Sequence, residues 1–174
     1  MTGRTVKEIS RSGRRTIGNA RPVPARGTLL GDRLAAVRGR TLELYAPLDP
    51  EHLVAQVSEL LSPPLWDLGH IGAYEELWLA RRVARDPPLH PELDDVHDAF
   101  ETPRSRRGDA PILPEAAARD YLGIVRGRSL ELLEASDLDD PARPLLVDGY
   151  VFEMVAEHEA QHTETVLQAL QMLP

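Results

Sequence analysis

The chain has 174 residues, the usual size of one domain with its own core. It has no cysteine, which excludes disulfides, thiolate nucleophiles and cysteine-ligated metal sites, so any metal site must use His, Asp or Glu. No apolar run approaches the roughly 18–20 residues of a membrane span. No apolar segment follows the basic residues near the N-terminus, so we predict a cytoplasmic protein without a membrane partner.

The net charge of −8 is distributed unevenly along the chain. Residues 1–30 hold seven basic residues and one acid, a charge of +6, so the remainder carries −14. An acidic body argues against a nucleic-acid-binding groove. Residues 1–28 have no apolar periodicity and no aromatic residue, which predicts a disordered basic arm. Contact of this arm with nucleic acid or anionic lipid is the weaker alternative.

Apolar residues recur three to four apart in several stretches, which predicts an all-α protein. The first helix is expected over residues 29–44 and a short second helix over residues 50–62. Ser62 followed by two prolines is typical of a helix start, with the serine as cap, and predicts a helix over residues 65–85.

Residues 86–113 contain five prolines and mixed charge, and form the longest irregular stretch expected in the body. Loops of this length are uncommon inside a compact domain and are often functional. Helices are expected again from Pro114 to about residue 133, and from about residue 146 nearly to the end. Four main helices with one long Pro-rich crossover loop predict a helical bundle over residues 29–174.

Two histidines of the last predicted helix carry the strongest functional signal. His158 and His162 are four residues apart and therefore stack on one face. We expect this face to continue the apolar stripe that includes Val155 and Val166, so that both rings point into the bundle. Burying two polar rings without partners is costly, and binding one metal ion removes that cost. The alternative is a pair of neutral histidines satisfied by neighbouring groups.

Residues 158–162 also match the His-Glu-x-x-His signature of zinc metalloproteases, in which Glu159 would be the general base. That signature requires a third ligand downstream. The twelve residues after His162 contain no histidine, and Glu164, their one acid, falls on a different face of the helix. The protease interpretation is therefore disfavoured, and the third ligand is expected upstream.

His70 is the best candidate for the third ligand. It shares a predicted helix face with Trp66 and Tyr74, and the adjacent Gly69 and nearby Gly72 allow a close approach by another helix or a ligand. The remaining histidines are expected at the surface, the last two being weaker alternative ligands: His52, His90 and His97. Three neutral histidines leave a divalent ion with open positions. Zinc would then activate water, whereas iron(II) would accept a substrate and O₂, and ligand type alone does not choose between them.

Two segments resemble the N-terminal part of the ergothioneine-biosynthesis sulfoxide synthases (EgtB family): WDLGHIGAYEELW at 66–78 and HEAQHTETVLQ at 158–168. The resemblance implies a DinB-like four-helix bundle whose iron-binding histidines are His70, His158 and His162. Members of the family are non-haem iron(II) enzymes. They use O₂ to join the thiol of γ-glutamylcysteine or cysteine to hercynine, a trimethylated histidine, and the product is a sulfoxide.

The family also has two arginines, three apart, that bind the carboxylates of the thiol substrate. The matching positions in the long loop are Arg104 and Arg107, with Arg106 as the alternative if the register differs. A guanidinium group suits a carboxylate. The other interpretation is a solvated basic run in a Pro-rich loop.

Family members continue into a second domain of the formylglycine-generating type, which supplies much of the hercynine pocket and an active-site tyrosine. We therefore expect this chain to be the iron-binding half of such an enzyme, partnered by a separate domain or chain of that type. A second hypothesis is a stand-alone DinB-like thiol-dependent transferase that uses Zn²⁺ or Ni²⁺. A third is a non-catalytic module that binds a metal or a partner.

Overall fold

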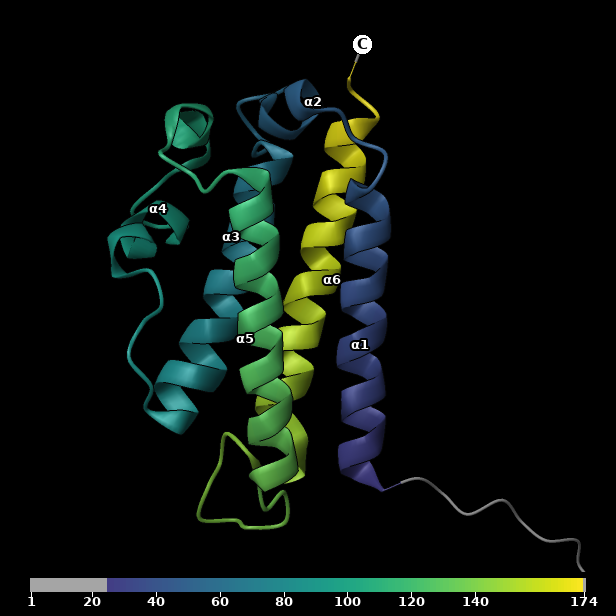
Figure 1. Cartoon of the computed structure of the whole chain (residues 1–174), viewed down its shortest axis with the longest axis vertical. Helices are drawn as coiled ribbons and strands as arrows, with labels where there is room; N and C mark the ends of the chain where they lie inside the picture. Colours follow the sequence, from purple (N-terminus) through teal and green to yellow (C-terminus); the bar gives the residue numbers. More distant parts are fainter. Residues whose placement is uncertain (1–24, 174) are drawn as a thin grey trace, which may run out of the picture.

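The computed structural model describes residues 25–173, and most of the predicted arm over residues 1–28 lies outside them. Within the described residues the protein is entirely helical and has no strand, which confirms the predicted fold class. Four long helices run side by side (Figure 1): α1 (Arg26–Tyr45), α3 (Pro64–Glu75), α5 (Glu115–Ala135) and α6 (Tyr150–Leu170). Helix α6 packs against α1 and α3, and α3 also packs against α5.

Helix α2 (Pro50–Val54) is shorter than the helix expected over residues 50–62. It ends because Ala55 takes an extended backbone conformation, and the chain then turns before α3. In Figure 1, α2 crosses one end of the bundle.

The start of α3 lies where the sequence predicts it, but Ser62 does not cap it. Pro63 is the residue that precedes the helix, and the helix start has no side-chain cap. The hydroxyl of Ser62 instead accepts a hydrogen bond of 2.8 Å from Nη1 of Arg107 in the long loop. The predicted cap is therefore wrong, because the helix begins at Pro64, one residue later than a cap at Ser62 requires.

Beyond Glu75 the same helix continues as a π-helix over Glu76–Ala84. It ends at Arg85, whose backbone is left-handed with φ of 68°. π-Helical turns inside α-helices are frequent at functional sites. This one begins six residues after His70, close to one of the predicted ligands.

The Pro-rich segment 86–113 lies along the outer side of α3 (Figure 1) and includes α4 (Asp94–His97), which contacts α3. Two short 3₁₀ turns, Pro91–Leu93 and Arg104–Asp109, complete the helical structure of this segment.

The last helix, α6, begins at Tyr150 rather than near residue 146. Asp148 and Gly149, within the short turn Val147–Gly149, have left-handed φ of 59° and 78°, and this kink sets the start of α6. A side chain at Gly149 would also collide with Leu30 of α1, because a Cβ there would lie 2.4 Å from a Leu30 methyl carbon.

The core consists of two apolar clusters that follow one another along the bundle. One is built around Leu34, Leu79 and Phe152, and the other around Tyr45, Leu68 and Val166. Each of the four long helices also contributes one buried charged residue to a shared group: Arg38, Glu75, Arg126 and Glu159.

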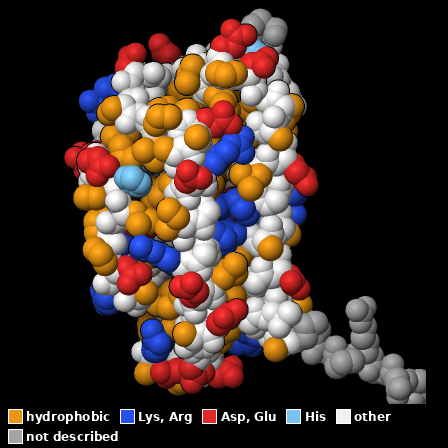
Figure 2. All heavy atoms as spheres, in the orientation of Figure 1, with side chains coloured by type: hydrophobic (Ala, Val, Ile, Leu, Met, Phe, Trp, Pro, Cys, Tyr) orange, Lys and Arg blue, Asp and Glu red, His pale blue; other side chains and the backbone are white. Residues whose placement is uncertain are grey.

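On the face shown in Figure 2, acidic, basic and apolar side chains are interspersed. No helix in the described part of the chain is long and apolar enough to cross a membrane.

Candidate metal centre

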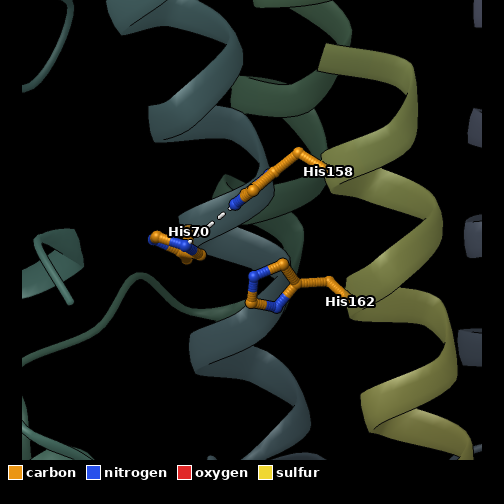
Figure 3. Close-up of side chains that lie close together, drawn as sticks. All are labelled: His70, His158 and His162. Atoms are coloured by element: carbon orange, nitrogen blue, oxygen red, sulfur yellow. Dashed lines mark hydrogen bonds between the residues drawn. The ribbon is translucent and has the colours of Figure 1, made fainter. Parts of the chain in front are cut away.

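The three histidines predicted as ligands converge in the space between α3 and α6 (Figure 3). Each of them offers a ring nitrogen that lies within 4.8 Å of the other two. Nε2 of His70 and Nε2 of His158 are 3.2 Å apart. Imidazole nitrogens bound to one ion at about 2.0–2.1 Å are separated by about 3 Å when the bonds are at right angles. The spacing of His70 and His158 therefore suits a shared ion.

The ring of His70 is held from the side facing the long loop. Its Nδ1 donates a hydrogen bond of 2.7 Å to the backbone carbonyl of His97 at the end of α4. A carbonyl can only accept, so Nδ1 carries the proton and Nε2 keeps its lone pair toward the other histidines. Trp66 stacks on the same ring, with centroids 4.9 Å apart, and its Nε1 donates to the carbonyl of Val96. The backbone carbonyls of Val96 and His97 in α4 therefore fix the orientation of Trp66 and His70 on α3.

His162 is held by a carboxylate. Its Nδ1 lies 3.1 Å from Oδ1 of Asp67, a residue of α3 whose side chain is 1% exposed. A histidine that ligates a metal through one nitrogen commonly donates its other N–H to such a carboxylate, which fixes the tautomer and the ring orientation. In Figure 3 the other ring nitrogen of His162 points toward the remaining two histidines.

His158 is oriented by an aromatic ring. It lies flat on Tyr74, with centroids 3.6 Å apart and the planes 8° from parallel. Burial, with the neighbouring imidazoles, lowers the pKa of His158 to about 2. Burial also lowers the pKa of His70 to about 4, although its hydrogen bond to the His97 carbonyl acts in the opposite direction. Both rings are therefore neutral at pH 7, the state in which imidazole binds a metal.

His97 does not lie at the surface as predicted, because its side chain is only 3% exposed. Gly69 makes the space for it. A Cβ at Gly69 would lie 2.3 Å from Cε1 of His97, so any other residue at position 69 would displace this ring. Neither ring nitrogen of His97 has a hydrogen-bond partner. The prediction that Gly69 and Gly72 permit close approaches is confirmed, since a Cβ at Gly72 would lie 2.7 Å from Cε1 of Tyr121 in α5.

The two predicted substrate arginines have different environments. Arg107 is 4% exposed, stacks over the ring of Trp66 at 3.6 Å, and donates to Ser62 and to the carbonyl of Thr102. It therefore lies one aromatic ring away from His70. Arg104 is exposed at the start of the Arg104–Asp109 turn.

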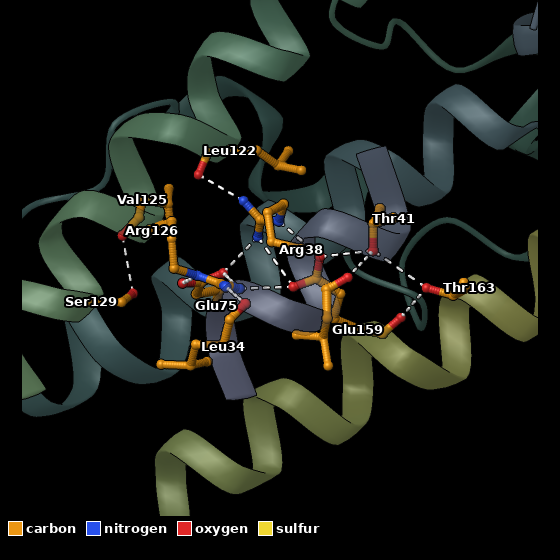
Figure 4. Close-up of polar contacts among 11 residues, drawn as sticks. Leu34, Arg38, Thr41, Glu75, Leu122, Val125, Arg126, Ser129, Glu159 and Thr163 are labelled. Carbon is orange, nitrogen blue, oxygen red and sulfur yellow. Dashed lines mark hydrogen bonds and ion pairs between the residues drawn. The ribbon is translucent and has the colours of Figure 1, made fainter. Parts of the chain in front are cut away.

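Glu159 is directed away from the histidines on either side of it. Its carboxylate joins Glu75, Arg38 and Arg126 in a buried group, the four-residue ion cluster, that links all four long helices (Figure 4). Hydrogen bonds of 2.7–3.3 Å connect both arginines to both carboxylates. Glu159 is thus a structural group and has no access to the metal centre as a general base.

Further hydrogen bonds satisfy the outward-facing donors and an acceptor of the ion cluster. Arg38 donates to the carbonyl of Leu122, Arg126 donates to the carbonyl of Leu34, and Thr41 donates to Glu159. Sequence reasoning missed this cluster, although helical spacing contained a signal. Arg38 lies four residues after the buried Leu34, and Glu159 lies three after Ala156, so both fall on apolar faces.

The histidines themselves lie at the margin of the apolar stripe of α6 rather than in its middle. Both are partly exposed, whereas Val155, Glu159 and Val166 are fully buried. The metal centre therefore opens at the side of the bundle. A cavity of about 500 Å³ adjoins it, lined by His70, His158 and a ring of aromatic and acidic side chains: Tyr74, Trp78, Phe100, Asp94, Asp95 and Asp98.

The residues present fit a divalent ion on two grounds. The donor set consists of three imidazoles, of which two have their second nitrogen occupied by a hydrogen bond. In addition, Oδ2 of Asp67 is buried without a hydrogen-bond partner, and a nearby cation would compensate this charge. The fold and the site together define a helical-bundle domain with a three-histidine centre that could hold a metal.

The chain belongs to the DinB superfamily, which it matches over residues 33–166. It is 45% identical over 145 residues to a hercynine oxygenase of Mycolicibacterium smegmatis, covering 82% of this chain and 32% of that protein. Identity to the hercynine oxygenase of Mycobacterium tuberculosis is 43% with the same coverage. Identity to that of Mycolicibacterium thermoresistibile is 40% over 152 residues, or 86% of this chain and 32% of the relative. The chain thus spans about a third of the length of these relatives, and the resemblance found in the sequence is confirmed.

Proposed function

We propose that this chain is the iron-binding part of an O₂-dependent sulfoxide synthase that joins a cysteine thiol to hercynine. The observation that carries this proposal is the convergence of His70, His158 and His162 in a domain 45% identical to a hercynine oxygenase. Iron(II) in such a site supplies open positions at which a thiol and O₂ can react. The cysteine-containing substrate is γ-glutamylcysteine or cysteine.

The cavity beside the histidines supports binding of a cationic substrate there. Hercynine carries a fixed trimethylammonium group, which aromatic faces and carboxylates attract. Tyr74, Trp78 and Phe100 supply such faces. Asp94 is already paired with Arg81, which leaves Asp95 and Asp98 as the acids that face a bound cation.

Arg104 and Arg107 are proposed to bind the carboxylates of the thiol substrate. Arg107 is the better positioned of the two, because it stacks on Trp66, which in turn stacks on His70. Two of its nitrogens already donate within the protein, so it would offer the remaining one to substrate. Arg104 has an exposed side chain and is the freer donor.

The test begins with protein purified without oxygen, in which bound metal is measured by elemental analysis. Hercynine and γ-glutamylcysteine are then added, O₂ uptake is recorded, and the carbon–sulfur product is sought by mass spectrometry. We expect one equivalent of iron(II) and binding of the thiol. We expect the chain alone to form the carbon–sulfur bond slowly, because aligning two substrates needs groups on both sides of the site.

A separately expressed second domain of the formylglycine-generating type from a relative is the complementing partner in this assay. An increase in product on mixing supports the proposal. Tight binding of zinc or nickel, with thiol transfer to an unrelated electrophile and no O₂ uptake even after mixing, would instead support the stand-alone transferase. The variant His158→Ala/His162→Ala is the control for activity that does not depend on the site.

A further inference from the structure

We propose that Asp67 is a positioning residue of the metal centre, which sets the tautomer of His162 and so determines which nitrogen the ion meets. This inference rests on the metal-binding part of the proposed function. Asp67 lies on α3 and His162 on α6, so their contact also links the two helices that supply the ligands.

The first step of the argument is the chemistry of the contact. A neutral imidazole has one N–H and one lone pair, and an ionised carboxylate has only acceptor oxygens. Nδ1 of His162 is 3.1 Å from Oδ1 of Asp67, so this nitrogen holds the proton. Nε2 is then left with the lone pair, on the side where His70 and His158 converge.

The second step is the burial of Asp67. Its side chain is 1% exposed, and Oδ2 is buried without any hydrogen-bond partner. An ionised carboxylate in such a place is unfavourable unless positive charge lies close by. Arg107, behind Trp66, supplies positive charge near this carboxylate, and a bound divalent ion would supply more. A role at the metal centre therefore accounts for the unfavourable burial of the Asp67 carboxylate.

The third step is the comparison of the three ligands. His70 is oriented by a backbone carbonyl and His158 by stacking on Tyr74, and neither contact carries a charge. Among the three, only His162 is held by a carboxylate within hydrogen-bond distance. Carboxylate partners raise the basicity of a ligating histidine as well as fixing its orientation, and their loss commonly costs about 10- to 100-fold in metal affinity.

Two substitutions separate the charge of Asp67 from its hydrogen bond. In Asp67→Asn the amide oxygen can still accept from Nδ1, so the tautomer should be kept while the charge is lost. In Asp67→Ala both are lost. Glu164→Gln is the matched control, because it removes an exposed acid two residues from His162 on the same helix.

The first measurement is ¹⁵N NMR of the His162 ring in metal-free protein, which distinguishes protonated from unprotonated nitrogens. We expect the proton on Nδ1 in the parent and in Asp67→Asn, and a shift of its population toward Nε2 in Asp67→Ala. A parent protein with the proton on Nε2, or a distribution unchanged by Asp67→Ala, would overturn the inference. A merely structural role of Asp67 would not move this signal.

The second measurement is the affinity for iron(II) or cobalt(II) by competition with a chelator under nitrogen. We expect a loss of about 10- to 100-fold for Asp67→Ala, a smaller loss for Asp67→Asn, and no change for Glu164→Gln. Equal affinities for parent and both Asp67 variants would refute the positioning role while leaving the metal site intact. A parent that binds no metal would refute the proposed function, and the NMR result would then decide on Asp67 by itself.

Discussion

The carboxylates of the ion cluster lie on the same two helices as the three-histidine centre, yet the two groups are built in opposite ways. In the ion cluster, Glu75 lies five residues after the ligand His70. Glu159 directly follows the ligand His158. Both carboxylates are fully buried and are bonded to both arginines. The three histidines are partly exposed, and His70 and His158 border a cavity.

The difference shows how one helix can place a stabilising ion pair on one face and candidate metal ligands on the adjacent face. Two positive and two negative side chains with complete hydrogen bonding leave nothing for a ligand to satisfy. The histidine centre directs three ring nitrogens toward one region and keeps a buried oxygen of Asp67 without a partner. Incomplete satisfaction of buried polar groups is therefore the feature that distinguishes the candidate site from the scaffold.

Removal of one member of the ion cluster should have the largest effect on stability. Glu159→Ala leaves Arg38 and Arg126 with one carboxylate between them in a buried position. Breaking a buried ion pair in this way costs about 3–5 kcal/mol in the free energy of unfolding. Urea denaturation followed by circular dichroism measures this loss.

The matched control for this prediction is Glu157→Ala. Glu157 is two residues away on α6, 60% exposed, and paired with Arg33 at the surface. Exposed pairs contribute about 0–1 kcal/mol. A loss of similar size in both variants would mean that the ion cluster does not carry the stability assigned to it here.

Gly69→Ala should disturb the histidine side of the comparison. The new methyl carbon would lie 2.3 Å from the buried ring of His97, whose backbone carbonyl holds His70. Overpacking of this kind costs about 1–3 kcal/mol, and metal affinity should fall with it. Gly127→Ala is the control, since a Cβ there meets no atom within 4 Å.

The double variant Gly69→Ala/His97→Ala tests the cause of that effect. Removing the ring of His97 makes room for the new methyl group while the carbonyl of residue 97 remains. Stability should therefore return part of the way toward that of His97→Ala alone. Additive losses from the two changes would show that Gly69 is required for another reason.

Acid should weaken the ion cluster before it affects the rest of the core. Burial by itself would raise the pKa of Glu75, but its contacts with Arg126 and Arg38 outweigh burial, and the pKa is lowered from its ordinary value of 4.5. A carboxyl with a lower pKa in the folded state contributes stability above its unfolded pKa and loses it as pH falls. The free energy of unfolding should therefore decline below about pH 4.5. In Glu75→Gln the decline should be shallower, and equal slopes would contradict this account.

The parts of this molecule that sequence alone could predict depend on short spacings. Helical periodicity gave the four long helices, and the four-residue interval between His158 and His162 placed them together. The ion cluster was missed because its partners are up to 121 residues apart, and the apolar spacing around Arg38 and Glu159 does not reveal which charge pairs with which. His97 was misplaced because its burial depends on space left by Gly69 in another helix. Contacts between distant segments require the packing of the helices, which local patterns do not contain.

Alanine at the ligand positions should change stability least and metal binding most. His158 and His162 lie at the edge of the core, so the double variant should alter the free energy of unfolding of the metal-free protein by about 1 kcal/mol or less. Loss of two of three ligands should nevertheless abolish tight binding of iron(II) or cobalt(II), measured under nitrogen by chelator competition. His90→Ala is the control, because it removes an imidazole outside the centre that is 37% exposed. Binding of one equivalent by the double variant as tight as in the parent would place the site elsewhere. A large loss of stability in the metal-free double variant would remove the contrast with Glu159 on which the separation of scaffold and site depends.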